Sequence, residues 1–263
     1  MRSDLEVALR AARVAADVVR DGFGFSSNVR MKGQVDPVTE TDTRAEAAIC
    51  EVLASERPDD GVLAEESGGD PWRAGRVWIV DPLDGTVNFV QGIPHVSVSV
   101  ALWDMGEPRV GVVIDVIRSE EFAAEAGQGA WLDGEPVAVS TQQNLGDAVV
   151  VTGFPYDRNE HAAAYGAVVG AVLEHVRGLR RLGSAALDFA WVSCGRFDAY
   201  WEYSLGPWDA AAGLLLVSEA GGRVSDEKGG RYDLESSTIV VSNGRLHEPL
   251  QALVASNLPA HLL

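Results

Sequence analysis

Five acidic side chains stand at the ends of predicted secondary-structure elements: Glu65, Glu66, Asp81, Asp84 and Asp209. A carboxylate at the end of an apolar strand needs a cation, because an unpaired buried charge is costly. Hard divalent ions such as Mg²⁺ take oxygen ligands, and phosphate commonly accompanies them. Taken singly, each acid is better explained as a solvated carboxylate or a helix cap. As an ordered set, the five indicate a metal site.

The segment 78–89, W-I-V-D-P-L-D-G-T-V-N-F, carries two of these acids. The apolar run 77–80 predicts a buried strand, which we expect to end at Asp81-Pro82 because proline lacks the donor that a sheet needs. Asp81 and Asp84 then lie across a tight turn. Gly85 and Thr86 follow and offer backbone N–H groups and a hydroxyl to an anion. A surface turn explains D-P-x-D-G equally well, so the rest of the chain must decide.

The other acids follow the same design. A short strand at 61–64 runs into Glu65 and Glu66 before a glycine turn. If the strand continues, these two side chains point to opposite faces, so at most one is a direct ligand and the other supports it. Asp209 falls in the first turn of a helix that begins at Pro207, where the helix dipole alone could explain it.

The hydrophobic pattern predicts two different arrangements of secondary structure along the chain. Strands near 96–102, 110–117 and 121–126 follow one another without helices, which favours an antiparallel sheet. After residue 148, strands alternate with helices, and Gly183-Ser184 caps one of them. The predicted helices cover 4–22, 43–56 (capped by Thr41 or Asp42), 159–175, 185–194, 207–219 and 247–255, and the later strands cover 149–151, 178–182, 197–202 and 238–242.

Composition limits the classes of function. The 263 residues are 46% hydrophobic, enough for one large domain or two packed halves, and 39 acidic against 21 basic side chains give a formal charge of −18. This balance argues against nucleic acid as a direct partner, and an anionic substrate would need metal ions as its counter-charge. Cys50 and Cys194 have no metal-ligand spacing and are predicted to be buried thiols. With no long apolar stretch, we expect a cytoplasmic protein with no membrane partner.

With these segments in view, the chain resembles the inositol monophosphatase family of Mg²⁺-dependent, lithium-sensitive phosphomonoesterases, from about residue 4 to 255. One small departure is Ala64, where many members carry Gly. The resemblance implies an α/β fold with α+β-like mixed sheets, a layered αβαβα sandwich of the inositol monophosphatase and fructose-1,6-bisphosphatase type. The segments that carry it are D-P-V-T-E-T-D (36–42), E-E-S-G-G (65–69), 78–89 as quoted, R-R-L-G-S-A-A-L-D (180–188) and W-D-A-A-A-G (208–213).

The resemblance also implies two halves and a homodimer. An N-terminal α+β half (1–145) would carry most metal ligands, and a C-terminal α/β half (146–263) would carry Asp209 and the substrate pocket. Two to three Mg²⁺ ions are implied per active site. Glu65, Asp81 and the carbonyl of Leu83 match the first metal's ligands, and Asp81, Asp84 and Asp209 match the second's, with Asp81 bridging.

The remaining roles implied by the resemblance concern substrate and water. Gly85 and Thr86 match a phosphate cradle, Glu66 supports a water, Asp42 orients Thr86, and Lys32 matches a mobile loop. The residues that match substrate contacts are Gly183, Ser184, Ala185 and Glu202, with Asp209 beside them. Positions around 154, 184 and 202 are expected to choose the alcohol.

The predicted reaction is hydrolysis of a small phosphate monoester of a polyol or amino alcohol, foremost myo-inositol monophosphate, with inhibition by Li⁺. We expect direct attack by water that Glu65 and Thr86 position or deprotonate, because metal ions lower the pKa of bound water and clamp both oxygens. Histidinol phosphate is the alternative substrate. Fructose 1,6-bisphosphate and 3′-phosphoadenosine 5′-phosphate are more distant, because the sequence shows no basic cluster for a second phosphate. A non-enzymatic alternative is binding to the transcription machinery.

Overall fold

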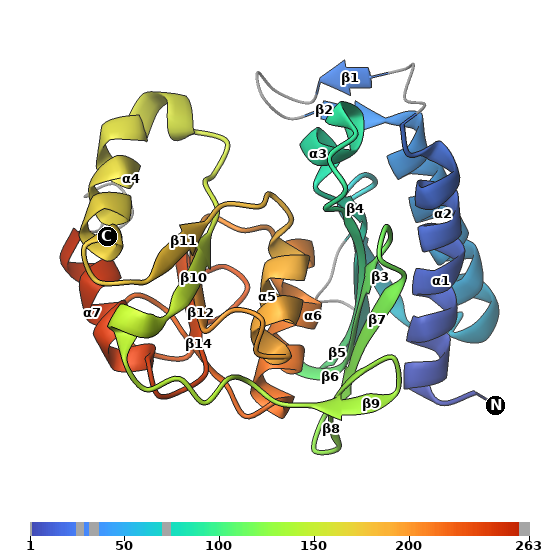
Figure 1. The fold of residues 1–263 in the computed structure, drawn as a ribbon. Coiled ribbons are helices and arrows are strands. Elements are labelled where there is room, and N and C mark those ends of the chain that lie inside the picture. Colours follow the sequence, from blue (N-terminus) through green and yellow to red (C-terminus); the bar gives the residue numbers. More distant parts are fainter. Residues whose placement is uncertain (1, 25–28, 32–36, 70–74, 258–263) are drawn as a thin grey trace.

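The computed structural model describes residues 2–24, 29–31, 37–69 and 75–257. These residues form five layers, helix, sheet, helix, sheet and helix, as the family resemblance implies (Figure 1). Helices α1 and α2 cover one outer face, α4 and α7 cover the other, and α5 and α6 lie between the two sheets. The helices are α1 (Asp4–Gly22), α2 (Glu40–Glu56), α3 (Thr86–Gln91), α4 (Arg158–Leu173), α5 (Ala185–Ser193), α6 (Pro207–Glu219) and α7 (His247–Asn257).

The first sheet has seven strands in the order β3-β4-β5-β6-β7-β8-β9. Only β3 and β4 run parallel, and the other pairs are antiparallel, which confirms the prediction from uninterrupted strands. The strands are β3 (Gly61–Ala64), β4 (Arg76–Asp84), β5 (Ser97–Asp104), β6 (Glu107–Asp115), β7 (Glu120–Glu125), β8 (Gly129–Leu132) and β9 (Glu135–Val137).

The second sheet has five strands in the order β11-β10-β12-β14-β13. Strand β10 runs parallel to β11 and β12, and β14 runs antiparallel to both of its neighbours. These strands are β10 (Val149–Thr152), β11 (Gly178–Arg180), β12 (Ala199–Tyr203), β13 (Arg223–Ser225) and β14 (Thr238–Ser242). A separate pair, β1 (Val29–Met31) and β2 (Pro37–Thr39), lies near α3 (Figure 1).

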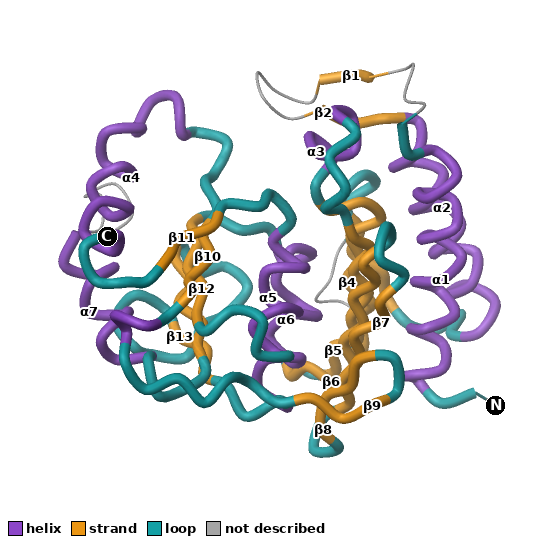
Figure 2. Tube along the Cα trace, in the orientation of Figure 1, coloured by secondary structure: helices purple, strands orange, loops and turns teal. Residues whose placement is uncertain are grey.

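The central core lies between the sheets and depends on α5 and α6 (Figure 2). Every residue of α6 from Ala210 to Val217 is buried, because the helix is enclosed on all sides. Close approach requires small residues: a Cβ on Gly213 would come within 2.3 Å of the Phe189 ring, and one on Gly111 within 2.7 Å of the Ala212 carbonyl oxygen. The outer helix α1, by contrast, buries one apolar face, as its sequence predicts.

Several predicted boundaries were wrong. Helix α2 begins at Glu40 rather than Thr43, because Thr39 is its N-cap and Asp42 completes a capping box from the first turn. The strand expected to stop at Asp81-Pro82 runs on to Asp84, with an irregularity between Asp81 and Asp84. Strands β1, β2 and β13 and the short helix α3 were not predicted. Cys50 and Cys194 are free thiols, half-buried rather than buried.

Among the described residues, none of the helices combines the length and apolar character needed to span a bilayer.

The tight contact between β6 and α6 generates a prediction about stability. Gly111→Ala would force its Cβ against the backbone of Ala212, so we expect the free energy of unfolding to fall by about 1–3 kcal/mol. Urea denaturation measures this. Gly166→Ala is the control, because Gly166 is exposed in α4 with open space around it, and the change should raise helix stability by roughly 0.5–1 kcal/mol. Equal effects of the two substitutions would contradict this packing.

Candidate metal centre and active site

Three carboxylates from two elements converge at one point: Asp81 and Asp84 from β4, and Asp209 from α6. Each offers an oxygen, and these oxygens all lie within 4.8 Å of one another. Residues three apart on a regular strand point to opposite faces. Here Asp81 pairs with Ser99 and Asp84 with Ser97, two residues apart, so the bulge places both aspartates on one face.

Hydrogen bonds hold the aspartates in place. Asp84 Oδ2 accepts from the Ser184 hydroxyl at 2.6 Å, the Ala186 N–H at 2.8 Å and the Ser97 hydroxyl at 3.3 Å. Asp209 Oδ2 accepts from the Gly206 N–H at 2.7 Å, within a capping arrangement at the start of α6. In these bonds each of the two residues accepts through Oδ2, so Oδ1 would be the oxygen that each offers to a metal ion.

The electrostatics of the group call for a cation. Burial, and then the neighbouring charges of Glu65, Asp84 and Asp209, raises the pKa of Asp81 well above its ordinary value. Burial raises the pKa of Asp209 in the same way, with Asp84 and Glu65 adding to it. For Asp84, burial raises the pKa although the bonds from Ser184 and Ala186 oppose the shift. An all-oxygen donor set with crowded negative charge fits a hard divalent ion such as Mg²⁺.

The two acids that follow β3, Glu65 and Glu66, lie in different environments, as the sequence suggested. Glu65 lines the cleft that contains the three aspartates, and its carboxyl interacts with Asp81. Glu66 is not among the lining residues, and its backbone N–H donates to Glu46 Oε2 at 2.8 Å. The Ser67 N–H donates to the other oxygen of Glu46 at 3.0 Å. Glu46, a buried acid of α2 that sequence reasoning missed, therefore fixes the turn that carries Glu65.

Thr86 lies at the start of α3 between two acceptors. Its hydroxyl is 3.2 Å from Asp42 Oδ1 and 3.1 Å from the Leu83 carbonyl oxygen, so its single proton can serve one of them at a time. Asp42 is itself held by the N–H and the hydroxyl of Thr39. The structure thus places Asp42 against Thr86, as the resemblance implied. Lys32 lies outside the described residues.

Gly85 is needed for close approach. Its φ is +90°, and a Cβ there would come within 3.0 Å of the His95 carbonyl oxygen and 3.1 Å of the Gly183 carbonyl oxygen. The turn at Gly183, Ser184 and Ala185 lines the same cleft. Ser184 is buried, caps α5 and donates to Asp84, so its side chain links the two halves of the site.

The far wall of the cleft carries Glu202 from β12. Its Oε2 accepts the hydroxyl of Tyr200, and burial raises the pKa of Glu202 to about 7. Gly153 allows this placement, because a Cβ there would lie 2.0 Å from Glu202 Oε1. Phe154, Ser184 and Glu202, from the three regions expected to choose the alcohol, all line the cleft.

Sequence reasoning missed several residues of the cleft. Arg158, Arg181 and Asp188 line it, although no basic cluster was predicted there. The last two fall within the segment 180–188 that carried the resemblance, which is the signal that could have found them. Arg158 comes from α4, and no spacing in the sequence links it to the acids.

The model of the inositol monophosphatase family matches residues 1–261 of this chain. The chain belongs to this family. An inositol-1-monophosphatase of Rhizobium meliloti is 40% identical over 259 residues, covering 97% of each protein. A protein of Pseudomonas aeruginosa named Nus factor SuhB is 39% identical and covers 100% of this chain and 99% of its own.

Solved structures of family members agree with the fold. The extragenic suppressor protein suhB of Bartonella henselae superposes with a TM-score of 0.91 at 38% identity, covering 95% of this chain and 97% of that one. An IMPase of Thermotoga maritima superposes with a TM-score of 0.90 at 35% identity, covering 96% of this chain and 97% of that one. The family assignment and the mixed α/β fold predicted from the sequence are therefore confirmed, and the family supports a phosphatase.

The raised pKa of Asp81 generates a prediction for the metal-free protein. Because the folded-state pKa exceeds the unfolded one, the native state binds more protons between the two values, and stability falls as pH rises through that window. Above this pH window, the native state bears the full free-energy cost of the ionised Asp81 carboxylate. Asp81→Asn removes this penalty and keeps the acceptor that bonds the Leu83 N–H at 3.0 Å. We expect its melting temperature without metal at pH 7 to rise by roughly 2–4 °C, about 1 kcal/mol for a chain of this size.

The same thermal scans with Mg²⁺ provide the second half of this test. Bound Mg²⁺ should raise the melting temperature of the wild type and leave that of Asp81→Asn nearly unchanged. A variant that melts lower than the wild type without metal, or that gains as much from Mg²⁺, would contradict the role of Asp81 as a crowded ligand.

Proposed function

We propose that this protein is a Mg²⁺-dependent phosphatase that hydrolyses a small phosphate monoester, foremost myo-inositol monophosphate. The observation that carries the proposal is the convergence of Asp81, Asp84 and Asp209 beside Glu65 in a cleft whose opposite wall bears Glu202. In a protein of charge −18, a phosphate dianion needs a cation to approach such a site. The reaction we propose is the one that the sequence predicts.

In this proposal, different residues bind the metal ions, orient the water and bind the phosphate. Asp81, Asp84 and Asp209, with Glu65 and the Leu83 carbonyl, would hold two to three Mg²⁺ ions. When bound, these ions neutralise the phosphate and lower the pKa of water. Thr86 and Glu65 orient the attacking water, with Asp42 holding Thr86 through its hydroxyl, and Glu66 supports this arrangement. The N–H groups of Gly85 and Thr86 receive the phosphate oxygens.

The leaving alcohol lies on the C-terminal side of the cleft. Gly183, Ser184 and Ala185 bound it, and Glu202 accepts hydrogen bonds from its hydroxyls. We propose that residues 1–145 supply most metal ligands and that residues 146–263 supply Asp209 and this alcohol pocket. We also propose that the enzyme is a cytoplasmic homodimer. Light scattering of the purified protein tests whether it is a dimer.

A phosphate-release panel tests the function. Inositol 1-phosphate, histidinol phosphate, fructose 1,6-bisphosphate and 3′-phosphoadenosine 5′-phosphate are compared with Mg²⁺, without metal, and with added Li⁺. We expect the highest kcat/KM with inositol 1-phosphate, loss of turnover without Mg²⁺, and inhibition by Li⁺. The bisphosphate belongs in the panel because Arg158 and Arg181 line the cleft. Asp84→Asn should lower kcat at least about 100-fold by removing a ligand.

Two results would refute this assignment: no phosphate release from any ester with Mg²⁺, or turnover in Asp84→Asn equal to that of the wild type. The charge-matched control is Asp17→Asn, an exposed position of α1 paired with Arg20, which should keep full activity.

A second function has its own support, because the relatives at 39–40% identity include proteins named Nus factor SuhB. We propose binding to the transcription machinery as a role separate from hydrolysis. In a pull-down with purified RNA polymerase and elongation factors, both the wild type and Asp84→Asn should be retained, since the metal site is not the contact surface. Absence of both from the bound fraction would exclude this role.

A further inference from the structure

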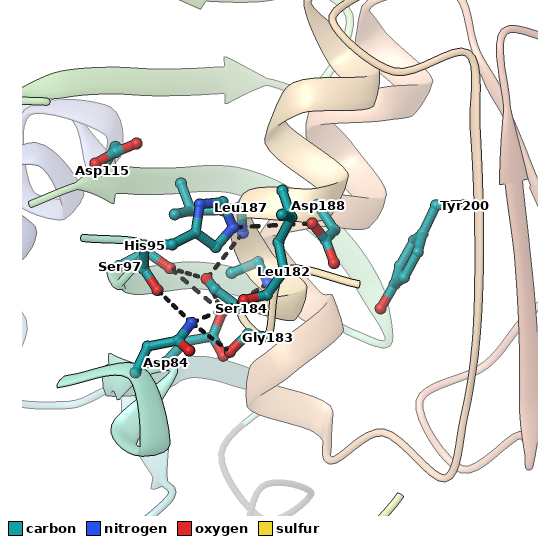
Figure 3. A network of polar contacts seen from close by, with 12 residues as sticks. Asp84, His95, Ser97, Asp115, Leu182, Gly183, Ser184, Leu187, Asp188 and Tyr200 are labelled. Atoms are coloured by element: carbon teal, nitrogen blue, oxygen red, sulfur yellow. Dashed lines mark hydrogen bonds and ion pairs between the residues drawn. The ribbon is translucent and has the colours of Figure 1, made fainter. Parts of the chain in front are cut away.

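Two buried polar atoms beside the cleft, His95 Nε2 and Asp188 Oδ1, have no hydrogen-bond partner among the described residues. They face each other in Figure 3, and they are 3.9 Å apart, just beyond hydrogen-bond distance. The side chains are almost completely enclosed, with 7% of His95 and 1% of Asp188 exposed. Unpaired buried polar atoms are rare in folded proteins because each costs free energy, so a pair at a cleft indicates a role in function.

The position of Asp188 connects it to the substrate side of the site. It lies in the first turn of α5, directly after the turn of Gly183, Ser184 and Ala185, and it lines the cleft. Glu202 lines the same wall. Burial, followed by the charges of Glu202 and Asp84, raises the pKa of Asp188 well above its ordinary value, and Arg181 opposes the shift. The fold therefore keeps a second carboxyl at this wall at an electrostatic cost.

His95 is held rigidly behind Asp188. Its ring packs edge-on against Trp191, with the ring centres 5.1 Å apart. Two guanidinium groups contact the Trp191 ring, with Arg118 at 5.0 Å and Arg196 at 5.2 Å from its centre. The His95 carbonyl oxygen accepts from Asn88 Nδ2 at 2.8 Å. The imidazole thus packs against an anchored Trp191, and its backbone is held by Asn88.

We propose that Asp188 is a specificity-determining residue that, together with Glu202, accepts hydrogen bonds from the hydroxyls of the leaving alcohol. His95 is a positioning residue: a small rotation of Asp188 closes the 3.9 Å gap to His95 Nε2 and directs the second carboxyl oxygen into the cleft. This inference rests on the proposed phosphatase function and deepens it. It assigns the substrate class as phosphate esters of alcohols that carry at least two neighbouring hydroxyl groups.

The chemistry of the wall supports this class. A carboxyl group keeps an acceptor oxygen whether or not it is ionised, so two carboxyls at the cleft match a molecule that presents several donors. Tyr200 occupies Glu202 Oε2, which leaves Oε1 for one hydroxyl. Asp188 then provides the acceptor for the next hydroxyl. An aryl leaving group presents no donor, so its phosphate ester gains nothing from either residue.

The test compares two esters that differ in their donors: inositol 1-phosphate and phenyl phosphate, both with Mg²⁺. Asp188→Asn keeps the shape of the side chain and replaces one carboxyl oxygen with an NH₂ group, which cannot accept a hydrogen bond. We expect KM for inositol 1-phosphate to rise about tenfold, the scale of one lost hydrogen bond. The kcat for this ester, and both parameters for phenyl phosphate, should stay within twofold of the wild type.

A second variant tests the positioning role. His95→Phe keeps a ring against Trp191 and removes the imidazole nitrogens, so KM for inositol 1-phosphate should rise about threefold while phenyl phosphate is unaffected. Asp17→Asn, the exposed control, should change neither ester. Circular dichroism verifies that each variant is folded.

The results distinguish a failure of the inference about Asp188 from a failure of the proposed phosphatase function. An equal loss with both esters would show a structural role and overturn the inference, as would an unchanged KM for inositol 1-phosphate in Asp188→Asn. If the folded wild type hydrolyses neither ester, the proposed function is refuted and this inference with it. Wild-type turnover of both esters, with no difference between them in the variants, refutes the inference alone.

Discussion

The crowding of like charge around Asp81 is the constraint on which the rest of the structure depends. Three carboxylate oxygens lie within 4.8 Å of one another in a buried site, with Glu65 beside them. Such a group is unfavourable unless a cation joins it, and it persists only if the surrounding fold holds each member in place. The bulge in β4, the capped start of α6 and the donors around Asp84 all serve this purpose.

Asp84 explains why the two sheets must be packed as they are. It belongs to a strand of the seven-stranded sheet, yet it accepts hydrogen bonds from Ser184 and Ala186 at the start of α5. Helix α5 packs beside α6, and α6 lies against β6 through the missing side chain of Gly111. A shift of either helix would therefore move Asp209 or release Asp84. The packing of the central core therefore holds the acidic cluster in place.

The two walls of the cleft carry different chemistry. The N-terminal wall concentrates carboxylates around the point where a cation and a phosphate would meet. The C-terminal wall carries the carboxyl groups of Glu202 and Asp188, and Tyr200 donates its hydroxyl to Glu202 from behind that wall. Arg158 and Arg181 line the same cleft and supply positive charge in a strongly acidic protein.

The sequence by itself determined which strands and helices carry the acids and in what order, because hydrophobic periodicity marks those elements locally. The layered fold was predicted from the resemblance to the inositol monophosphatase family. It also located the helix caps at Ser184 and the start at Pro207. It could not determine the face on which Asp81 and Asp84 point, since that depends on a bulge set by pairing with Ser97 and Ser99. Nor could it connect Glu46 to Glu66, or His95 to Asp188, because those contacts join residues far apart in the chain. Only the tertiary structure decides which distant side chains share one buried volume, and that sharing makes the site.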